Sequence, residues 1–293
     1  MTLAPDFVAT AAELACLLEV SAVKPGNVAP GRHFHDTRYE DFLASAAAIG
    51  PALARAGEQA VGPTVLAAIE ATTRWTKANT NLGIVLLFTP IARAALMQGD
   101  AHALTHASLR QGVTDVLEAT TVADTRDVYA AIRLAQPGGL GRTGEHDVNA
   151  PEPPTATLRS VMTLAQARDA VAREYATNFA AVFDLGVPTL ERARRDGLHW
   201  EFAAVETFLT LLAAAPDTLI QRKLGPAVAG SVSRQAMRVV ALGGVRTDAG
   251  RDALATFDAE LRDATNGRNP GTTADLTAAT IFAALLTGGW KRA

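Results

Sequence analysis

Hydrophobic residues recur every three or four positions through most of this 293-residue chain. That spacing places them on one face of an α-helix, as residues 7–22 show with Val8, Ala12, Ala15 and Leu18. Further helices are predicted over residues 41–56, 62–77, 84–97, 105–119, 125–135, 158–175, 177–195, 200–214, 226–241, 247–264 and 273–287, and another starts at 216–218. The first of these is expected to be interrupted near Gly50–Pro51, and Asp124–Thr125 is the expected cap of the helix at 125–135. The pattern predicts an all-α protein.

Two-residue alternation, the pattern of a half-buried strand, is scarce, and its best candidate is the short segment Arg238–Leu242. The longest irregular stretch covers residues 137–157 and includes Gly138, Gly139 and Gly141. A loop of about 20 residues is unusual in a compact domain and often serves as a binding element or lid. Because helical patterns continue on both sides, we predict a single-domain multi-helix bundle over residues 1–293, with 137–157 as a loop or candidate lid.

Composition narrows the function classes. Hydrophobic residues make up 48% of the chain, and 27 basic against 30 acidic residues give a net charge of −3, so no overall attraction to nucleic acid or membrane is expected. The one cysteine, Cys16, excludes an intrachain disulfide. The N-terminus lacks the basic segment of a signal peptide, and apolar runs such as 84–87 are too short to span a bilayer. We therefore expect a cytoplasmic protein.

Two polar, helix-breaking segments stand at opposite ends of the chain. They are Lys24-Pro25-Gly26-Asn27 and Asn269-Pro270-Gly271-Thr272-Thr273-Ala274-Asp275-Leu276. Proline ends a helix, and glycine allows positive φ or a close approach to a ligand. We predict that these breaks fold back to line a central polar cleft formed by helix termini and loops.

Each break also has a purely structural interpretation. Asn79, Thr80 and Asn81 precede an apolar helix and either cap its free amides or use them as an anion cradle. Thr272 and Asp275 have the spacing of a capping box, and the alternative is that Asp275 binds Mg²⁺ bridged to phosphate. Lys24 follows a helix end and is otherwise explained as a partner of the helix dipole.

The loop at residues 26–37 contains His33, His35 and Asp36. The two histidines lack the HxxxH or HxxEH arrangement of a zinc site. A hydrogen-bonding or acid–base role for His35 and a solvated loop histidine are both open. The glycines at 138–141 match neither a P-loop nor a dinucleotide-binding turn. Asp169 and Arg173, four residues apart, are expected to form a surface ion pair.

Taken together, these segments resemble the triphosphoribosyl-dephospho-CoA synthase family. The resemblance runs from Glu19-Val20-Ser21-Ala22-Val23-Lys24-Pro25-Gly26-Asn27-Val28 through Asn79-Thr80-Asn81-Leu82-Gly83 and Asp217-Thr218-Leu219-Ile220-Gln221-Arg222 to the segment at 269–276. Members linked to citrate lyase usually have Thr-His-Lys-Gly where this chain has Thr80-Asn81-Leu82-Gly83, and Gly-Gly-Ser-Ala-Asp where it has Gly271-Thr272-Thr273-Ala274-Asp275. These departures indicate a divergent branch.

The resemblance implies a transferase that moves the 5-triphosphoribosyl group of ATP to 3′-dephospho-CoA and releases adenine. The implied catalytic residues are His35, Asp36 and Asp275, and Asp36, Asp124 and Asp275 are the implied Mg²⁺ ligands. Implied nucleotide or phosphate contacts are Lys24, Gly26, Asn27, Asn79, Thr80, Asn81, Gly83, Arg222, Asn269, Gly271, Thr272 and Thr273. The loop with Gly138, Gly139 and Gly141 is the implied mobile cover.

Two alternatives differ in activity. One is an enzyme of the same fold that acts on another phosphorylated precursor in one-carbon, methanopterin-type cofactor biosynthesis. The other is a non-catalytic helical protein that binds a nucleotide. In each case we expect small-molecule partners and no nucleic acid or membrane partner, with a homodimer as the assembly considered.

Overall fold

The computed structural model describes residues 3–98, 104–139, 141 and 145–290. Within these ranges the chain forms fourteen α-helices and no strand, and an isolated bridge joins Ala29 to Arg32. The all-α prediction is therefore confirmed. The strand candidate at 238–242 is wrong, because residues 238–241 form the last turn of a helix.

The helices follow the predicted order along the chain. They are α1 (Pro5–Ser21), α2 (Tyr39–Ala54), α3 (Val61–Thr73), α4 (Leu82–Met97), α5 (His106–Glu118), α6 (Val122–Ala135), α7 (Leu158–Ala165), α8 (Ala170–Thr177), α9 (Val187–Arg195), α10 (Trp200–Ala214), α11 (Thr218–Leu224), α12 (Pro226–Ala241), α13 (Asp248–Leu261) and α14 (Gly271–Leu286). A π-helical segment, η2 (Ala181–Gly186), precedes α9, and a 3₁₀ turn, η3 (Gly244–Arg246), precedes α13.

Two predicted helices are each divided. The helix expected at 158–175 becomes α7 and α8 because Asp169 caps a new helix, with its carboxylate accepting the Ala172 N–H at 3.1 Å. The helix expected at 177–195 begins late because Asn178 and Phe179 adopt positive φ values of 54° and 59°. Gly50–Pro51, in contrast, does not interrupt α2, which continues to Ala54.

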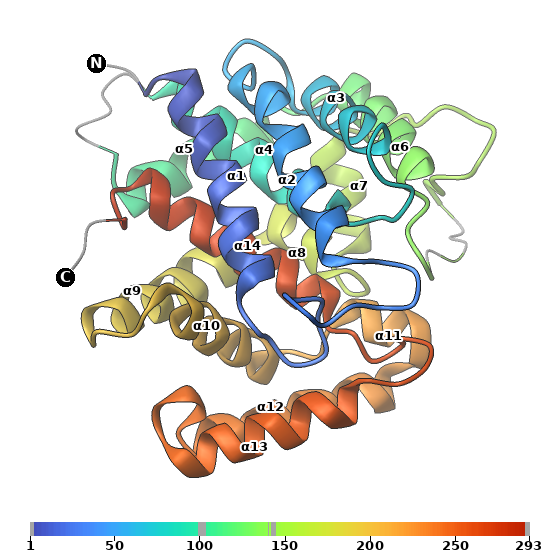
Figure 1. The fold of residues 1–293 in the computed structure, drawn as a ribbon. Helices are drawn as coiled ribbons and strands as arrows, with labels where there is room; N and C mark the ends of the chain where they lie inside the picture. Colours follow the sequence, from blue (N-terminus) through green and yellow to red (C-terminus); the bar gives the residue numbers. More distant parts are fainter. Residues whose placement is uncertain (1–2, 99–103, 140, 142–144, 291–293) are drawn as a thin grey trace.

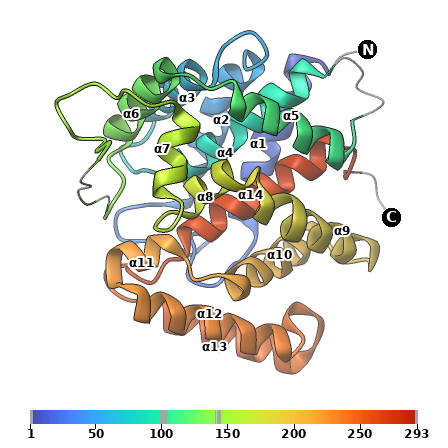
Figure 2. The same ribbon diagram turned by 180° about the vertical axis from the view of Figure 1, so that it is seen from behind.

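Helices α4 and α14 form the centre of the core. Figure 1 shows α14 running through the middle of the molecule beside α1, α4 and α10, and Figure 2 shows α8 against it from behind. Both central helices are buried on nearly all sides, and their rings Phe88 and Phe282 stack at 4.5 Å. Their first turns also meet, because a Cβ on Gly83 would lie 2.1 Å from the Asp275 carboxylate. The two central helices therefore begin at the same place.

Helices α3 and α6 pack closely through a glycine. The cap of α6 is Thr121, and Asp124 completes the capping box by accepting the Thr121 N–H at 2.8 Å, which corrects the predicted Asp124–Thr125 cap. The other Asp124 oxygen accepts the Gly62 N–H at 2.7 Å. A Cβ on Gly62 would lie 2.5 Å from the Asp124 Cα, so only glycine permits this approach.

In the part of the chain that the structure describes, no single helix is long and apolar enough to cross a membrane. One pair, α10 and α11, bent by 56° at the break between them, has the necessary combined length and composition.

We predict that Gly62→Ala lowers the free energy of unfolding by about 1–3 kcal/mol, because the added methyl group would force the backbones of α3 and α6 apart. The control is Gly230→Ala within α12, where the nearest atom to a new Cβ is the end of the Arg234 side chain at 3.4 Å. That change should stabilise the protein by about 0.4–1 kcal/mol. Denaturant unfolding measures both, and equal effects of the two variants would contradict the packing account.

Candidate active site

A cavity of about 270 Å³ lies where the end of α1, the starts of α4, α8 and α14, and helices α6, α7 and α11 come together. Its polar lining comes mainly from helix ends and includes Glu19, Asn27, Asn79, Thr80, Asn81, Arg168, Asp169, Arg222, Asn269, Thr272 and Asp275. Its apolar lining comes largely from α6, α7 and the neighbouring loops and includes Phe34, Tyr129, Ile132, Val148, Val161, Met162 and Leu164. The cavity therefore offers both a polar and an apolar wall.

Asp217 and Thr218 join three of these helix starts. One oxygen of the buried Asp217 carboxylate accepts the N–H groups of Leu219 at 2.8 Å and Ile220 at 3.1 Å, which caps α11. The other accepts the N–H and the hydroxyl of Thr273, both at 2.7 Å, in the first turn of α14. This replaces the predicted Thr272–Asp275 capping box, because the cap residue of α14 is Pro270, which makes no side-chain cap bond.

Thr218 extends the junction to α8. Its hydroxyl accepts the Ala170 N–H at 3.1 Å and donates to the Thr272 hydroxyl at 3.3 Å. Arg222, one turn along α11, forms an ion pair with Asp169, the cap of α8. Asp169 therefore pairs with Arg222, and the predicted surface pair with Arg173 does not form.

Asp275 lies deep in the protein, but its carboxylate keeps part of its surface open to the cavity. It makes no hydrogen bond or ion pair with any residue in the described ranges. Burial raises the pKa of Asp275 well above its ordinary value, and the negative charges of Glu19, Asp217 and Asp169 raise it further, while Arg222 opposes them. Asp275 is thus a buried acid without a hydrogen-bond or ion-pair partner in the described part of the chain.

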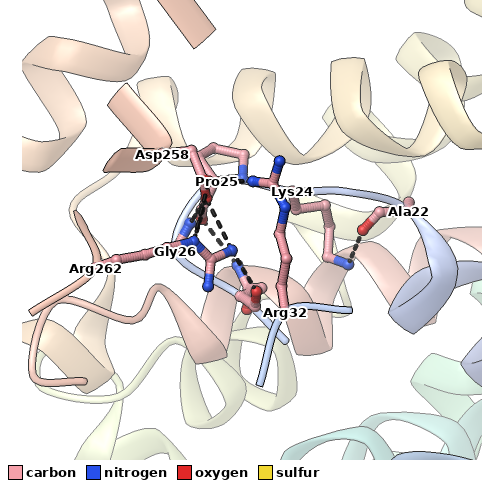
Figure 3. A network of polar contacts seen from close by, with 8 residues as sticks. Ala22, Lys24, Pro25, Gly26, Arg32, Asp258 and Arg262 are labelled. Atoms are coloured by element: carbon pink, nitrogen blue, oxygen red, sulfur yellow. Dashed lines mark hydrogen bonds and ion pairs between the residues drawn. The ribbon is translucent and has the colours of Figure 1, made fainter. Parts of the chain in front are cut away.

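Lys24 lies behind the cavity wall, outside its lining. Its buried ammonium hydrogen-bonds the Ala22 backbone carbonyl at 3.0 Å (Figure 3). It also bonds the Glu19 backbone carbonyl and lies 2.9 Å from Glu19 Oε1. The two carbonyl bonds and the ion pair direct the ammonium toward the end of α1, so Lys24 caps that helix. The structure therefore places Lys24, predicted as a phosphate contact, outside the cavity lining, where it supports Glu19.

Gly26 and Asn27 have separate roles in the same turn. Gly26 has a φ of +72°, donates its N–H to Asp258 at 2.8 Å, and leaves no room for a Cβ against Leu261. Figure 3 shows Asp258 held between Arg32 and Arg262, which ties the turn to α13. Gly26 is therefore a structural residue, whereas the neighbouring Asn27 lines the cavity.

Asn79, Thr80, Asn81 and Gly83 all line the cavity at the start of α4. Asn79 caps this helix by accepting the Leu82 N–H at 3.2 Å. The Thr80 hydroxyl bonds the Ser45 hydroxyl, and the Asn81 amide donates to Thr72 Oγ1 at 3.1 Å. The polar run therefore fixes α4 against α2 and α3 while its outer surface faces the cavity.

Three predicted residues lie elsewhere. His35 and Asp36 are exposed and do not line the cavity, and His35 contacts Asn266 at 3.0 Å. The two Asp124 oxygens serve the α6 cap and Gly62. Among the described residues, no group of three or more His, Cys, Asp or Glu side chains is arranged to hold a metal. Of the three predicted metal ligands, only Asp275 reaches the cavity.

His146 is a cavity residue that the sequence interpretation missed. It has a positive φ of 48°, uncommon outside glycine, and its carbonyl accepts the Tyr129 hydroxyl at 2.6 Å. Gly138 also lines the cavity, and Gly139, at φ +73°, packs against Arg222, whereas Gly141 is exposed. Leu140 and residues 142–144 of the candidate lid lie outside the described residues.

We predict that Asp275→Asn stabilises the free protein by about 1–3 kcal/mol at pH 8, because it removes a buried carboxylate that lacks partners. Because folding raises the pKa of Asp275, this carboxyl stays protonated in the native state at pH values at which the unfolded chain, with a pKa of 3.8, has lost the proton. The contribution of this group to stability is therefore present at low pH and falls as the pH rises above about 4. Denaturant unfolding from pH 5 to 8 should show a steeper decline for the parent, and parallel curves would contradict this account.

Comparison with known proteins identifies the family. The chain matches the family model for ATP:dephospho-CoA triphosphoribosyl transferase over residues 5–293. Proteins of Pseudomonas putida and Klebsiella pneumoniae that carry the name 2-(5″-triphosphoribosyl)-3′-dephosphocoenzyme-A synthase are 37% and 35% identical over 112 residues, and each match covers 38% of this chain and 39% of the relative. A crystal structure from Archaeoglobus fulgidus, named as a triphosphoribosyl-dephospho-CoA synthase, is 27% identical with a TM-score of 0.65, covering 85% of this chain and 100% of that one. The chain belongs to the ATP:dephospho-CoA triphosphoribosyl transferase family.

Proposed function

We propose that this chain transfers the 5-triphosphoribosyl group of ATP to 3′-dephospho-CoA and releases adenine, with the cavity at the starts of α4, α8 and α14 as its active site. The observation that carries the proposal is the Asp275 carboxylate, which faces the cavity without a partner among the described residues. Burying an ionisable group in this way is costly, so a binding role accounts for its retention. Family membership over residues 5–293 supports the same reaction.

The polar wall suits a triphosphate. Arg168 and Arg222 line the cavity and bring positive charge to it. Gly271 and Thr272 also line it in the first turn of α14, where the helix dipole favours an anion. The Thr273 amide and hydroxyl bond Asp217, so Thr273 holds the helix start in place and is not proposed as a phosphate ligand.

Mg²⁺ fits this donor set if it enters with the nucleotide. A hard cation bound to phosphates typically takes only one or two protein carboxylates, and Asp275 has one free. Glu19, Glu145 and Asp169 line the same cavity and are the further carboxylates within the site. Bound Mg²⁺ would neutralise phosphate charge beside these acidic side chains. Its binding would also favour the ionised form of Asp275.

The proposed reaction exchanges one bond at the ribose. The bond between C1′ and the adenine nitrogen breaks, and a bond between C1′ and the acceptor hydroxyl oxygen forms. The hydroxyl loses one proton and the departing adenine gains one, so the reaction balances without another reagent. Positive charge develops on the sugar, as in glycoside hydrolysis, and the carboxylates of Glu19 and Asp275 would stabilise it.

His146 is our candidate for moving the proton. It lines the cavity, and an imidazole is suited to acid–base work near neutral pH. Tyr129 and Val148 lie beside it in the lining and provide apolar surface for adenine or for the acceptor. Excluding water at this wall would favour transfer to the acceptor over hydrolysis.

Incubation of the purified protein with ATP, Mg²⁺ and 3′-dephospho-CoA should release adenine and form the triphosphoribosyl product in equal amounts, detected by chromatography and mass spectrometry. We expect Asp275→Asn to lower this rate by at least about 100-fold, since removing one electrostatic contact to a transition state costs that much. Asp252→Asn, the same change on the exposed face of α13, should keep the parent rate. No adenine above background would reject the proposed reaction.

A second comparison separates the two histidines. We predict that His146→Gln lowers the rate of adenine release by about 100-fold or more, because a cavity acid–base group is lost. His35→Gln should change the rate by less than about threefold, since this exposed ring lies outside the cavity. The measurement is kcat at saturating ATP and acceptor. A large effect of His35→Gln with none from His146→Gln would reverse the assignment.

A further inference from the structure

Unsatisfied buried polar atoms are concentrated at the cavity. In the described part of the chain, five buried side-chain nitrogen or oxygen atoms have no hydrogen-bond partner. Three of them, Glu19 Oε1, Arg222 Nε and Asn269 Oδ1, belong to residues that line the cavity. Proteins leave few such atoms unpaired, so their concentration here indicates groups that a ligand would satisfy.

Asn269 differs from the other two because it has no ionic partner. Glu19 Oε1 lies 2.9 Å from the Lys24 ammonium, though without an aligned hydrogen bond, and Arg222 pairs with Asp169. Asn269 is held through its backbone, with its carbonyl accepting the Gly271 N–H at 2.9 Å. Its side-chain oxygen is thus a neutral acceptor that lacks a donor among the residues the structure describes.

The missing donor can be assigned by chemistry. Phosphate oxygens in a nucleotide are acceptors and cannot satisfy Asn269 Oδ1. Ribose hydroxyls and the adenine amino group can both donate to it, and a hydroxyl, which also accepts, suits either orientation of the amide. Asn269 directly precedes the start of α14, where Gly271 and Thr272 face the proposed triphosphate site. In a nucleotide the ribose is the unit attached to the phosphates.

We propose that the Asn269 side chain accepts a hydrogen bond from a ribose hydroxyl of an adenine nucleotide bound in the cavity, and so selects ribonucleotides over deoxyribonucleotides. This inference rests on the proposed function, in which both ATP and 3′-dephospho-CoA contain an adenosine ribose. A site built to bond a hydroxyl rejects an analogue that lacks it, because its own polar group is then left unpaired.

Isothermal titration in the presence of Mg²⁺ tests this inference through binding. Deoxyribosyl bonds differ in reactivity, so a dissociation constant is more informative than a rate. The ligands are ATP, 2′-deoxy-ATP, 3′-deoxy-ATP and 3′-dephospho-CoA, each titrated alone. The variants are Asn269→Leu and Asn269→Ala, which remove the acceptor, and Asn269→Asp, which keeps one. Asn149→Leu makes the matched change on an exposed side chain outside the cavity lining.

The parent should bind one deoxy analogue about tenfold more weakly than ATP. Asn269→Leu and Asn269→Ala should weaken the binding of ATP by a similar factor and abolish the difference in affinity between ATP and that analogue. Asn269→Asp and Asn149→Leu should keep the difference. If Asn269→Leu and Asn269→Ala weaken the binding of 3′-dephospho-CoA and leave the binding of ATP unchanged, the ribose that bonds Asn269 is that of the acceptor.

Two results would overturn the inference and leave the proposed function intact. One is a parent that binds ATP and both deoxy analogues equally while Asn269→Leu and Asn269→Ala leave the binding of 3′-dephospho-CoA unchanged. The other is a difference between ATP and a deoxy analogue that survives in Asn269→Leu and Asn269→Ala. The proposed function fails in a distinct way, through a parent that binds neither ATP nor 3′-dephospho-CoA.

Discussion

The position of the cavity depends on the Asp217–Thr218 pair, which holds three helix starts together. A single buried carboxylate accepts bonds from the first turns of α11 and α14, and the adjacent hydroxyl bonds the first turn of α8. Each of these helix starts supplies a polar residue of the lining, namely Asp169, Arg222 and Asp275. Helix starts are rich in unpaired amides, so bringing them together creates an anion site only if something fixes their relative positions.

The same arrangement places acidic side chains close together, so their negative charges repel one another. Burial and the charges of Glu19, Asp217 and Asp169 all raise the pKa of Asp275, and burial raises that of Asp217. Asp217 recovers part of this cost through hydrogen bonds, whereas Asp275 makes none with the residues that the structure describes. The free protein thus holds unfavourable electrostatic energy at the cavity, which a bound cation would relieve. This difference indicates that Asp217 positions the helix starts, whereas Asp275 is the carboxylate proposed to bind a ligand.

The sequence predicted the helical class and the convergence of distant breaks, because periodicity and helix-breaking residues act locally. The sequence was a poorer guide to which polar residues line the cavity. Lys24 and Gly26 were predicted as site residues because polar residues surround them in the sequence. In the structure Lys24 bonds the end of α1, and Gly26 bonds Asp258 of α13. His35 and His146 lie in loops without periodicity, so only the tertiary path of each loop decides which ring enters the cavity. The double cap by Asp217 joins residues 56 positions apart, a separation that no local pattern reports.

The most direct test of the central claim is a crystal structure of the protein with ATP and Mg²⁺ in the absence of acceptor. The account predicts the triphosphate against Arg222 and the first turn of α14, the ribose facing Asn269, and the cation at Asp275. Nucleotide bound instead at the exposed loop that carries His35 and Asp36, with the cavity holding only water, would contradict it.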